Sequence, residues 1–253
     1  MHPPKGAVFQ MKQLETTGAR IIWERAPSSE WVRREDPLIR EEDFRLFYEG
    51  NLITQIPLSP EYLEEWGRGH LVSEGFCSPE QPLRIWREKK ALFALKTSSS
   101  EEPAKKPSSQ KIPCWSIGEE ILFEGMQKVQ EAPLYRKTGA AHVGALFSKN
   151  GELLVLREDL GRYNAADKVL GWGTARGVDF GDTFFLFSGR MPRGVVRKIA
   201  RVGIPLIGSV SAPTWDGVAL AEEHHITLLG FLRPPRMNLY VKGRISLEGV
   251  LLP

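Results

Sequence analysis

The stretch TFFLFSGRMPRGVVRKIARVGIPLIGSV, residues 183–210, decides the fold class of this 253-residue chain. It holds an apolar run of strand length at 183–187, an amphipathic segment of helix length at 193–202, and a second apolar run at 205–210. Short apolar runs without polar alternation are typical of strands that helices cover on both faces. The stretch therefore predicts a strand–helix–strand unit of an α/β protein.

The same alternation continues on both sides of this unit. Helical segments are predicted at 117–130, 164–172 and 216–224, and strands at 143–147, 153–157, 227–232 and 237–241. The segment Lys149-Asn150-Gly151 is typical of a hairpin turn between the first two of these strands. We expect residues 117–253 to form one α/β domain, a three-layer mixed sheet that binds a cofactor.

The N-terminal part predicts a smaller α+β subdomain over residues 35–96. A hairpin is expected at 44–56, followed by a helix with Ser59 as its N-cap and Gly75 just beyond its end. Residues 1–34 have few periodic apolar positions, and we expect them to form an N-terminal arm.

Composition narrows the class of protein. The net charge of +3 arises from 34 basic and 31 acidic residues, without the concentrated basic stripe of a nucleic-acid binder. No window is apolar enough to predict a membrane span, and the start lacks the apolar region of a secretory signal. Two cysteines are too few for a disulfide scaffold and suit a reducing compartment, so we expect a cytoplasmic protein.

Cys114 is the candidate nucleophile. The polar stretch before it cannot bury enough apolar surface to offset its ordering entropy, so 97–116 predicts a mobile loop that carries an exposed Cys114. A thiol near a helix N-terminus and near lysines ionises more readily, which suits a nucleophilic or sulfur-carrying role. The alternative is a cysteine without a function, which is the interpretation we favour for Cys77.

Three turns predict a phosphate-binding rim. Residues 157–168, 188–190 and 209–214 each follow a predicted strand and lead into a predicted helix, where α/β sheets bind ligands. Arg190 offers a guanidinium that can hold a phosphate, and helix N-termini offer free N–H groups. His142, just before a strand, is a candidate ligand or acid–base group. The alternative for each segment is an ordinary solvated turn or a structural histidine.

A zinc site is disfavoured. Pro113 and Cys114 begin the Pro-Cys-x-x-Cys motif of zinc nucleobase deaminases, but Ile117 stands where that motif has its second cysteine. Neither His70 nor His142 is followed two residues later by glutamate. We therefore predict no metal site and no zinc deaminase activity.

At this point the sequence resembles a known family, the formate dehydrogenase accessory sulfurtransferases, FdhD/NarQ. The segments that carry the resemblance are 138–142, 157–171, 188–190, 203–205, 209–214 and 230–240. Their order and spacing match the family over about residues 35–241, and the block from Glu158 to Gly171 is long enough to be specific by itself.

The resemblance implies a sulfurtransferase that works as a persulfide carrier. Such proteins take sulfur from a cysteine desulfurase and pass it to the molybdenum cofactor, bis(molybdopterin guanine dinucleotide), which formate dehydrogenase then receives. The family fold is cytidine deaminase-like without the zinc ligands. Its persulfide cysteine lies in a Cys-x-x-Cys loop that matches Cys114. Its guanine dinucleotide contact matches Phe231, Leu232, Arg233, Pro234, Pro235 and Arg236.

Ile117 departs from the family pattern, because it replaces the second cysteine of that loop. A persulfide carrier needs one thiolate, since the acceptor takes the outer sulfur, and a second thiol makes release easier. The alternative function is a molybdenum-cofactor chaperone that transfers no sulfur. The expected partners are the desulfurase, the catalytic subunit of formate dehydrogenase and a second copy of the chain in a homodimer.

Overall fold

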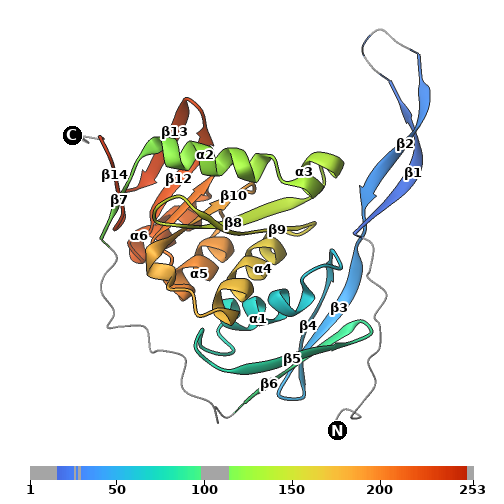
Figure 1. The fold of residues 1–253 in the computed structure, drawn as a ribbon, viewed down its shortest axis with the longest axis horizontal. Coiled ribbons are helices and arrows are strands. Elements are labelled where there is room, and N and C mark those ends of the chain that lie inside the picture. Colours follow the sequence, from blue (N-terminus) through green and yellow to red (C-terminus); the bar gives the residue numbers. More distant parts are fainter. Residues whose placement is uncertain (1–15, 26, 28–29, 98–113, 250–253) are drawn as a thin grey trace.

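The computed structural model describes residues 16–25, 27, 30–97 and 114–249. They form a six-stranded sheet flanked by helices, a four-stranded sheet with one helix, and a two-stranded ribbon that projects from the body (Figure 1). A short parallel pair, β7 (Ser116–Ile117) with β14 (Ser246–Leu247), lies near the C-terminal end of the described part. The predicted mixed α/β class is confirmed.

The six-stranded sheet has the order β13-β12-β11-β10-β8-β9. Its strands are β8 (His142–Ser148), β9 (Leu153–Asp159), β10 (Thr183–Phe187), β11 (Leu206–Ser209), β12 (Thr227–Arg233) and β13 (Arg236–Val241). Four strands, β9 to β12, run in one direction, and β8 and β13 run against them. We call the edge where these four strands end the carboxyl edge, and the edge where they begin the amino edge.

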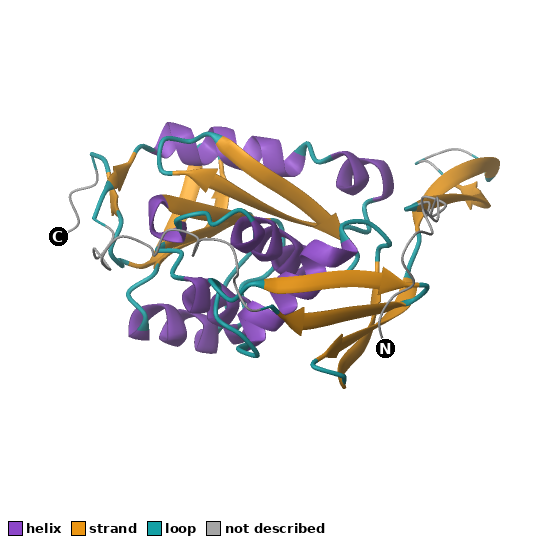
Figure 2. Ribbon diagram, turned by 60° about the horizontal axis from the view of Figure 1, so that its bottom comes forward, coloured by secondary structure: helices purple, strands orange, loops and turns teal. Residues whose placement is uncertain are grey.

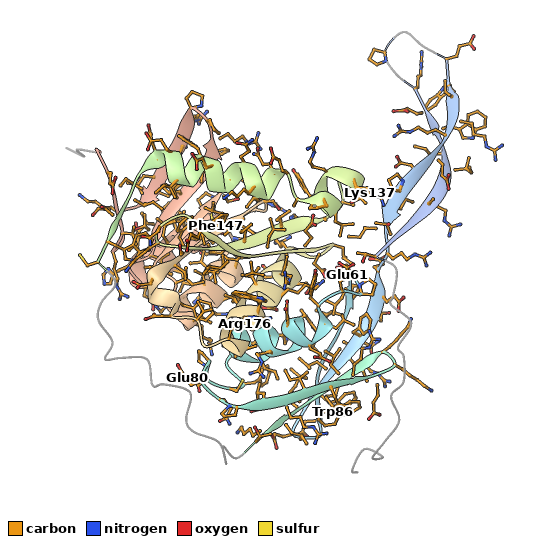
Figure 3. The ribbon with its side chains drawn as sticks, viewed as in Figure 1. Glu61, Glu80, Trp86, Lys137, Phe147 and Arg176 are labelled. Carbon is orange, nitrogen blue, oxygen red and sulfur yellow. The ribbon has the colours of Figure 1, made fainter. Side chains whose placement is uncertain are left out.

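Helices cover both faces of this sheet. They are α2 (Glu119–Gln130), α3 (Pro133–Thr138), α4 (Arg162–Ala175), α5 (Arg193–Val202) and α6 (Trp215–Glu223). Side chains of β10 alternate between two cores: Phe184 packs in the core beneath α2, and Phe185 packs in the core shared with α4, α5 and α6. Figure 3 shows Phe147 within the first core, where its ring stacks on Phe184 at 5.1 Å. Both faces are buried, as the continuous apolar strands predicted.

Several predicted elements match the structure closely. β10 and α5 have the predicted bounds, and Gly151 forms the predicted hairpin turn with a φ of 88°. The helix predicted at 117–130 begins at Glu119 instead, because Ser116 and Ile117 pair with β14 as a strand.

The four-stranded sheet has the order β4-β3-β6-β5 and carries α1 (Leu63–Glu74) on one face (Figure 2). Its strands are β3 (Glu42–Tyr48), β4 (Asn51–Leu58), β5 (Leu83–Glu88) and β6 (Ala91–Lys96). Phe44, Leu46 and Trp66 are buried between the sheet and α1. The predicted hairpin at 44–56 is confirmed as β3 and β4, and Gly75 ends α1 with a φ of 86°, as predicted.

Two glycines bring α1 against α4. A Cβ placed on Gly69 would lie 1.8 Å from the carbonyl oxygen of Asp167, and one on Gly171 would lie 1.7 Å from the carbonyl oxygen of Glu65. The backbones of the two helices are therefore in direct contact. This contact joins the N-terminal unit to the six-stranded sheet.

The prediction that Ser59 is the N-cap of α1 is wrong. The helix begins at Leu63, its N-cap is Tyr62 in the left-handed region with a φ of 54°, and no side chain caps it. Ser59 is buried, and its hydroxyl donates a 2.8 Å hydrogen bond to Oδ2 of Asp159. The partner lies 100 residues away, so a local capping rule does not find it.

The ribbon consists of β1 (Thr17–Glu24) and β2 (Val32–Ile39), paired antiparallel. The predicted boundary between an arm at 1–34 and a subdomain starting at residue 35 is wrong, because it falls inside β2. Figure 3 shows Lys137 near the base of the ribbon, where its Nζ donates a 3.4 Å hydrogen bond to Oγ1 of Thr17. The ribbon therefore contacts α3.

The predicted mobile loop at 97–116 lies mostly outside the described residues, which resume at Cys114. Within the described part the loop boundary at residue 116 is wrong, because Ser116 belongs to β7. No helix in the described ranges has the length and apolar character needed to cross a membrane.

Candidate functional site

The carboxyl edge brings together the segments that predicted a phosphate-binding rim. His142 pairs with Asp159 at the end of β9, and the amide of Val143 donates a 2.9 Å hydrogen bond to the hydroxyl of Ser188, just beyond β10. Further along, the amide of Phe231 donates to the carbonyl oxygen of Ser211 at 3.2 Å. The predicted common edge is therefore confirmed, with residues 188–190 between His142 and the end of β12.

The segment from Phe231 to Arg236 lies at this edge and comprises the end of β12, the turn at 234–235 and the first residue of β13. Phe231 has a φ of 50°, which is rare for a bulky residue, and the pairing of the strands is irregular here. The guanidinium of Arg236 lies 5.5 Å from the centre of the Phe231 ring, and both residues are exposed. Such irregular backbone clusters at binding sites, so this part of the predicted contact is well placed for a ligand.

The other residues of the segment 231–236 differ in their exposure to solvent. Arg233, Pro234 and Pro235 are exposed. The side chain of Leu232 is fully buried in the core beneath α2, so only its backbone remains for a ligand contact. The sequence resemblance alone does not separate these two kinds of residue.

His142 is half-buried beside the turn that carries Arg190. A Cβ on Gly189 would lie 3.1 Å from Nδ1 of His142, and the His142 ring stacks on Phe187 with 6.4 Å between ring centres. Burial is the largest cause that lowers the pKa of His142, and the charges of Arg162 and Arg190 lower it further. The imidazole therefore favours its neutral form in this place.

The predicted ligand role of residues 157–168 is largely replaced by a structural one. Lys168 and Asp159 form a fully buried ion pair with 2.7 Å between Nζ and Oδ2, and the ammonium also donates to Ser59. Arg157 pairs with Glu65 of α1 at 2.6 Å. The Arg157–Glu65 pair attaches α1 to the six-stranded sheet, and all of these charges are paired within the protein rather than free for a ligand.

A second buried network links the helices α1, α4 and α5. Lys198 of α5 is 2.9 Å from Asp167 and 2.7 Å from Glu74, and the hydroxyl of Ser73 donates to Asp167 at 2.6 Å. Burial acts to raise the pKa of Asp167, but the charge of Lys198 and the hydrogen bond from His70 overcome it and hold that pKa below its ordinary value. These residues therefore stabilise the packing of α1, α4 and α5 against one another.

Cys114 is exposed, and its neighbour Trp115 is bonded at the amino edge. The indole of the next residue, Trp115, donates a 3.0 Å hydrogen bond to the carbonyl oxygen of Gly181, just before β10. Ile117 is buried in the core beneath α2. The helix expected from residue 117 begins at Glu119, after β7, so Cys114 lies further from a helix N-terminus than predicted.

Trp115, the neighbour of Cys114, and the segment 231–236 are thus at opposite edges of one sheet. The length of β10 between them is roughly 17 Å at the usual rise per residue. The other cysteine, Cys77, is half-buried against two apolar cores, and burial raises the pKa of its thiol. Cys114 therefore has the more accessible of the two cysteine thiols in the sequence.

Sequence reasoning missed Trp215. This residue opens α6 at the carboxyl edge, and 88% of it is exposed. The predicted helix began one residue later, at residue 216, and so left the indole without an assignment. A tryptophan directly after the turn at 209–214 is the signal that would have added it to the rim.

Within the described ranges, no three or more His, Cys, Asp or Glu side chains lie close enough together to hold a metal ion.

Comparisons with known proteins agree on a single family. The family model FdhD/NarQ matches residues 94–246. The sulfur carrier protein FdhD of Shouchella clausii is 32% identical, over 94% of this chain and 99% of its own, and the protein FdhD of Methanocaldococcus jannaschii is 31% identical, over 83% and 91%. A crystal structure described as a formate dehydrogenase accessory protein from Desulfotalea psychrophila shares the fold, with a TM-score of 0.77, 24% identity, and 90% and 97% coverage. The chain belongs to the FdhD/NarQ family.

Proposed function

We propose that this protein is a sulfur carrier for formate dehydrogenase. Cys114 takes a sulfane sulfur from a cysteine desulfurase as a persulfide, and the sulfur is delivered to bis(molybdopterin guanine dinucleotide) molybdenum cofactor, the substrate. The catalytic subunit of formate dehydrogenase then receives the sulfurated cofactor. Relatives named sulfur carrier protein FdhD support the general role.

The exposure of Cys114 is the observation that carries this proposal. A persulfide carrier must present its thiol to a donor protein, and Cys114 is exposed, whereas Cys77 is half-buried. The thiolate attacks the outer sulfur of the donor's persulfide; a new S–S bond forms at Cys114 and the donor's cysteine leaves as a thiolate. In the second step Cys114 would present the persulfide to the cofactor substrate. A molybdenum centre in its reduced state would supply the two electrons that cleave the S–S bond and would keep the outer sulfur as a sulfido ligand. The persulfide proton would pass to solvent and Cys114 would return to a thiolate.

The carboxyl edge is the proposed nucleotide site. The exposed Phe231 ring and the Arg236 guanidinium offer stacking surfaces for guanine, and Arg190 offers a phosphate contact. We expect Arg236→Ala to weaken GDP binding by about 1.5–3 kcal/mol. Quenching of tryptophan fluorescence by GDP, lost in Trp215→Phe, would report binding at the same edge.

The proposed homodimer gives the sulfur a second route. Within one copy, the hydrogen bond of Trp115 keeps Cys114 at the amino edge. Residues 231–236, which we call the nucleotide segment, lie at the opposite edge. Between copies, the thiol of one chain can serve the nucleotide segment of the other. Coexpression of Cys114→Ala and Arg236→Ala chains separates these routes: restored formate dehydrogenase activity means transfer between copies, and its absence means transfer within one.

The central test is a persulfide assay. The protein is incubated with a cysteine desulfurase and cysteine, and its peptides are examined by mass spectrometry for an added sulfur atom. We expect the adduct on the peptide with Cys114, with Cys77→Ala unaffected as the matched control. An adduct that is absent, or that survives in Cys114→Ala, contradicts the proposal.

The second candidate, a cofactor chaperone without sulfur transfer, rests on Ile117, which leaves one thiol where the family pattern has two. If Cys114→Ala fully restores formate dehydrogenase activity in cells that lack their own family member, this candidate is correct. We further propose the cytidine deaminase-like arrangement of layers and a cytoplasmic place of action.

A further inference from the structure

Three positively charged or ionisable groups converge at the carboxyl edge away from the nucleotide segment. His142 comes from β8, Arg162 from the first residue of α4, and Arg190 from the turn after β10. His142 pairs across the strands with Asp159, three residues before Arg162, and the charges of both arginines lower its pKa. Gly189 allows the close approach, since a Cβ there would lie 3.1 Å from Nδ1 of His142.

The arginines of this cluster have no acidic partner. In the described part of the chain, neither Arg162 nor Arg190 forms an ion pair, and the Nε of Arg162 is buried without a hydrogen-bond partner. Asp159 is the nearest acid that acts on His142, but its two oxygens already bond Lys168, Ser59, Gly161 and Asn164. Arg190 is exposed, so water screens its charge, but the buried Nε of Arg162 is a costly donor without a hydrogen-bond partner among the described residues. A bound anion would give that donor an acceptor and both arginines a counter-charge.

The arginine of α4 is held in place by packing. Its guanidinium lies 4.8 Å from the centre of the Tyr163 ring, and that ring lies against Gly194, where a Cβ would be 2.9 Å from Cε1. The first turns of both α4 and α5 lack acidic residues, and no side chain caps either helix. The N–H groups of these turns add to the positive potential of the cluster.

We propose that His142, Arg162 and Arg190 form an oxyanion subsite that binds a phosphate or pyrophosphate group. The cluster begins on β8, and Phe231 lies on β12, three strands further along the sheet, which corresponds to about 14 Å. A ligand with a base at one end and phosphates toward the other can span this distance. Only the identity of that ligand rests on the proposed function; the subsite itself does not.

Calorimetry with inorganic pyrophosphate, orthophosphate and GDP tests the subsite. We expect Arg162→Gln to weaken pyrophosphate binding by about ten- to hundredfold. The matched control is Arg176→Gln: Arg176 lies at the other end of α4 (Figure 3), with its guanidinium 4.6 Å from the Trp172 ring centre. Wild-type protein that binds no pyrophosphate, or Arg162→Gln protein that binds it as well as the wild type, overturns the proposal.

Further variants separate the subsite from the nucleotide site and from folding. Arg236→Ala should weaken GDP binding and leave pyrophosphate binding unchanged; pyrophosphate binding without GDP binding supports the subsite and contradicts the nucleotide site. Orthophosphate that binds as tightly as pyrophosphate identifies free phosphate as the ligand. Arg162→Lys keeps the charge and should retain part of the affinity, which a merely misfolded variant would not.

His142 gives an independent readout. The charged groups that face it are Arg162, Arg190 and Asp159. A bound oxyanion favours the imidazolium, so pyrophosphate should raise the pKa of His142, and binding should strengthen as pH falls below neutrality. The NMR signal of His142, assigned with His142→Gln, measures this directly. A titration that pyrophosphate does not move overturns the proposal.

Discussion

The indole Nε1 of Trp115 donates a 3.0 Å hydrogen bond to the carbonyl oxygen of Gly181. Gly181 precedes β10, whereas Arg190 follows it, so the residue beside Cys114 is attached to the amino edge of the sheet. The carbonyl oxygen of Trp115 also accepts a bond from the amide of Ser246. The exposed thiol and the candidate ligand groups are therefore held apart by the sheet itself.

The two cysteines should differ in reactivity toward iodoacetamide. Cys114 is exposed, whereas Cys77 is half-buried and burial raises the pKa of its thiol, although Arg68 and Lys96 oppose this shift. Because the thiolate is the reactive form, we expect Cys77 in the native protein to react at least about tenfold more slowly than Cys114. Mass spectrometry of the alkylated peptides gives both rates. Equal rates in the native protein would contradict the burial of Cys77.

The ion pair of Lys168 with Asp159 should be essential for stability. Lys168→Met leaves a fully buried carboxylate without its partner, so the free energy of unfolding should fall by about 3–5 kcal/mol. The matched control is Lys149→Met, because Lys149 pairs with Asp182 on the exposed surface and its loss should cost at most about 1 kcal/mol. Urea denaturation measures both values. Similar losses in the two variants would show that the buried pair is not special.

The contact between α1 and α4 should not tolerate a methyl group. Gly171→Ala places a Cβ 1.7 Å from the carbonyl oxygen of Glu65, so the helices must separate, and we expect a loss of about 3 kcal/mol, the upper end of the usual range for overpacking. Gly67→Ala is the control on α1 itself, because its Cβ would meet only the side chains of Leu92 and Leu46 at 3.3–3.4 Å. A Gly171→Ala melting temperature equal to that of Gly67→Ala would refute the close backbone contact.

The elements that the sequence predicts best are those determined by contacts between residues close together in the chain. The bounds of β10 and α5 follow from an apolar run and a helical period, and the turn at Gly151 follows from an Asn-Gly pair. The common edge of the three turns also follows, because parallel strands joined by helices must end on the same side.

The assignments that differ depend on partners far away in the sequence. Ser59 has the residue type of an N-cap, but its hydroxyl bonds Asp159, and Lys168 completes the group from 109 residues away. The charges of the block 157–168 suggested a ligand site, yet Arg157 bonds Glu65 of α1, and Asp159 pairs with Lys168 in the interior. Local spacing does not distinguish these outcomes, because both need clustered charges beside a strand end.

Acid should destabilise the protein through Asp167. Its carboxyl pKa in the folded state lies below the ordinary 3.8, because Lys198 and the hydrogen bond from His70 outweigh burial. The unfolded chain therefore binds more protons as pH falls toward and below 3.8. The contribution of Asp167 to the free energy of unfolding is fully present well above pH 3.8 and is lost as pH falls through the folded-state pKa.

Urea denaturation at a series of pH values tests this sign with Asp167→Asn. The variant should be less stable than the wild type by about 3 kcal/mol or more at pH 7, because Lys198 loses a buried partner. The difference should shrink as pH falls below about 4, since protons then bind the Asp167 carboxyl of the wild type, first in the unfolded chain and at lower pH in the folded protein. The exposed Asp182 supplies the control: Asp182→Asn should change stability by at most about 1 kcal/mol at pH 7. A difference between wild type and Asp167→Asn that stays constant into strong acid would show that the carboxylate charge does not stabilise the joint between α4 and α5.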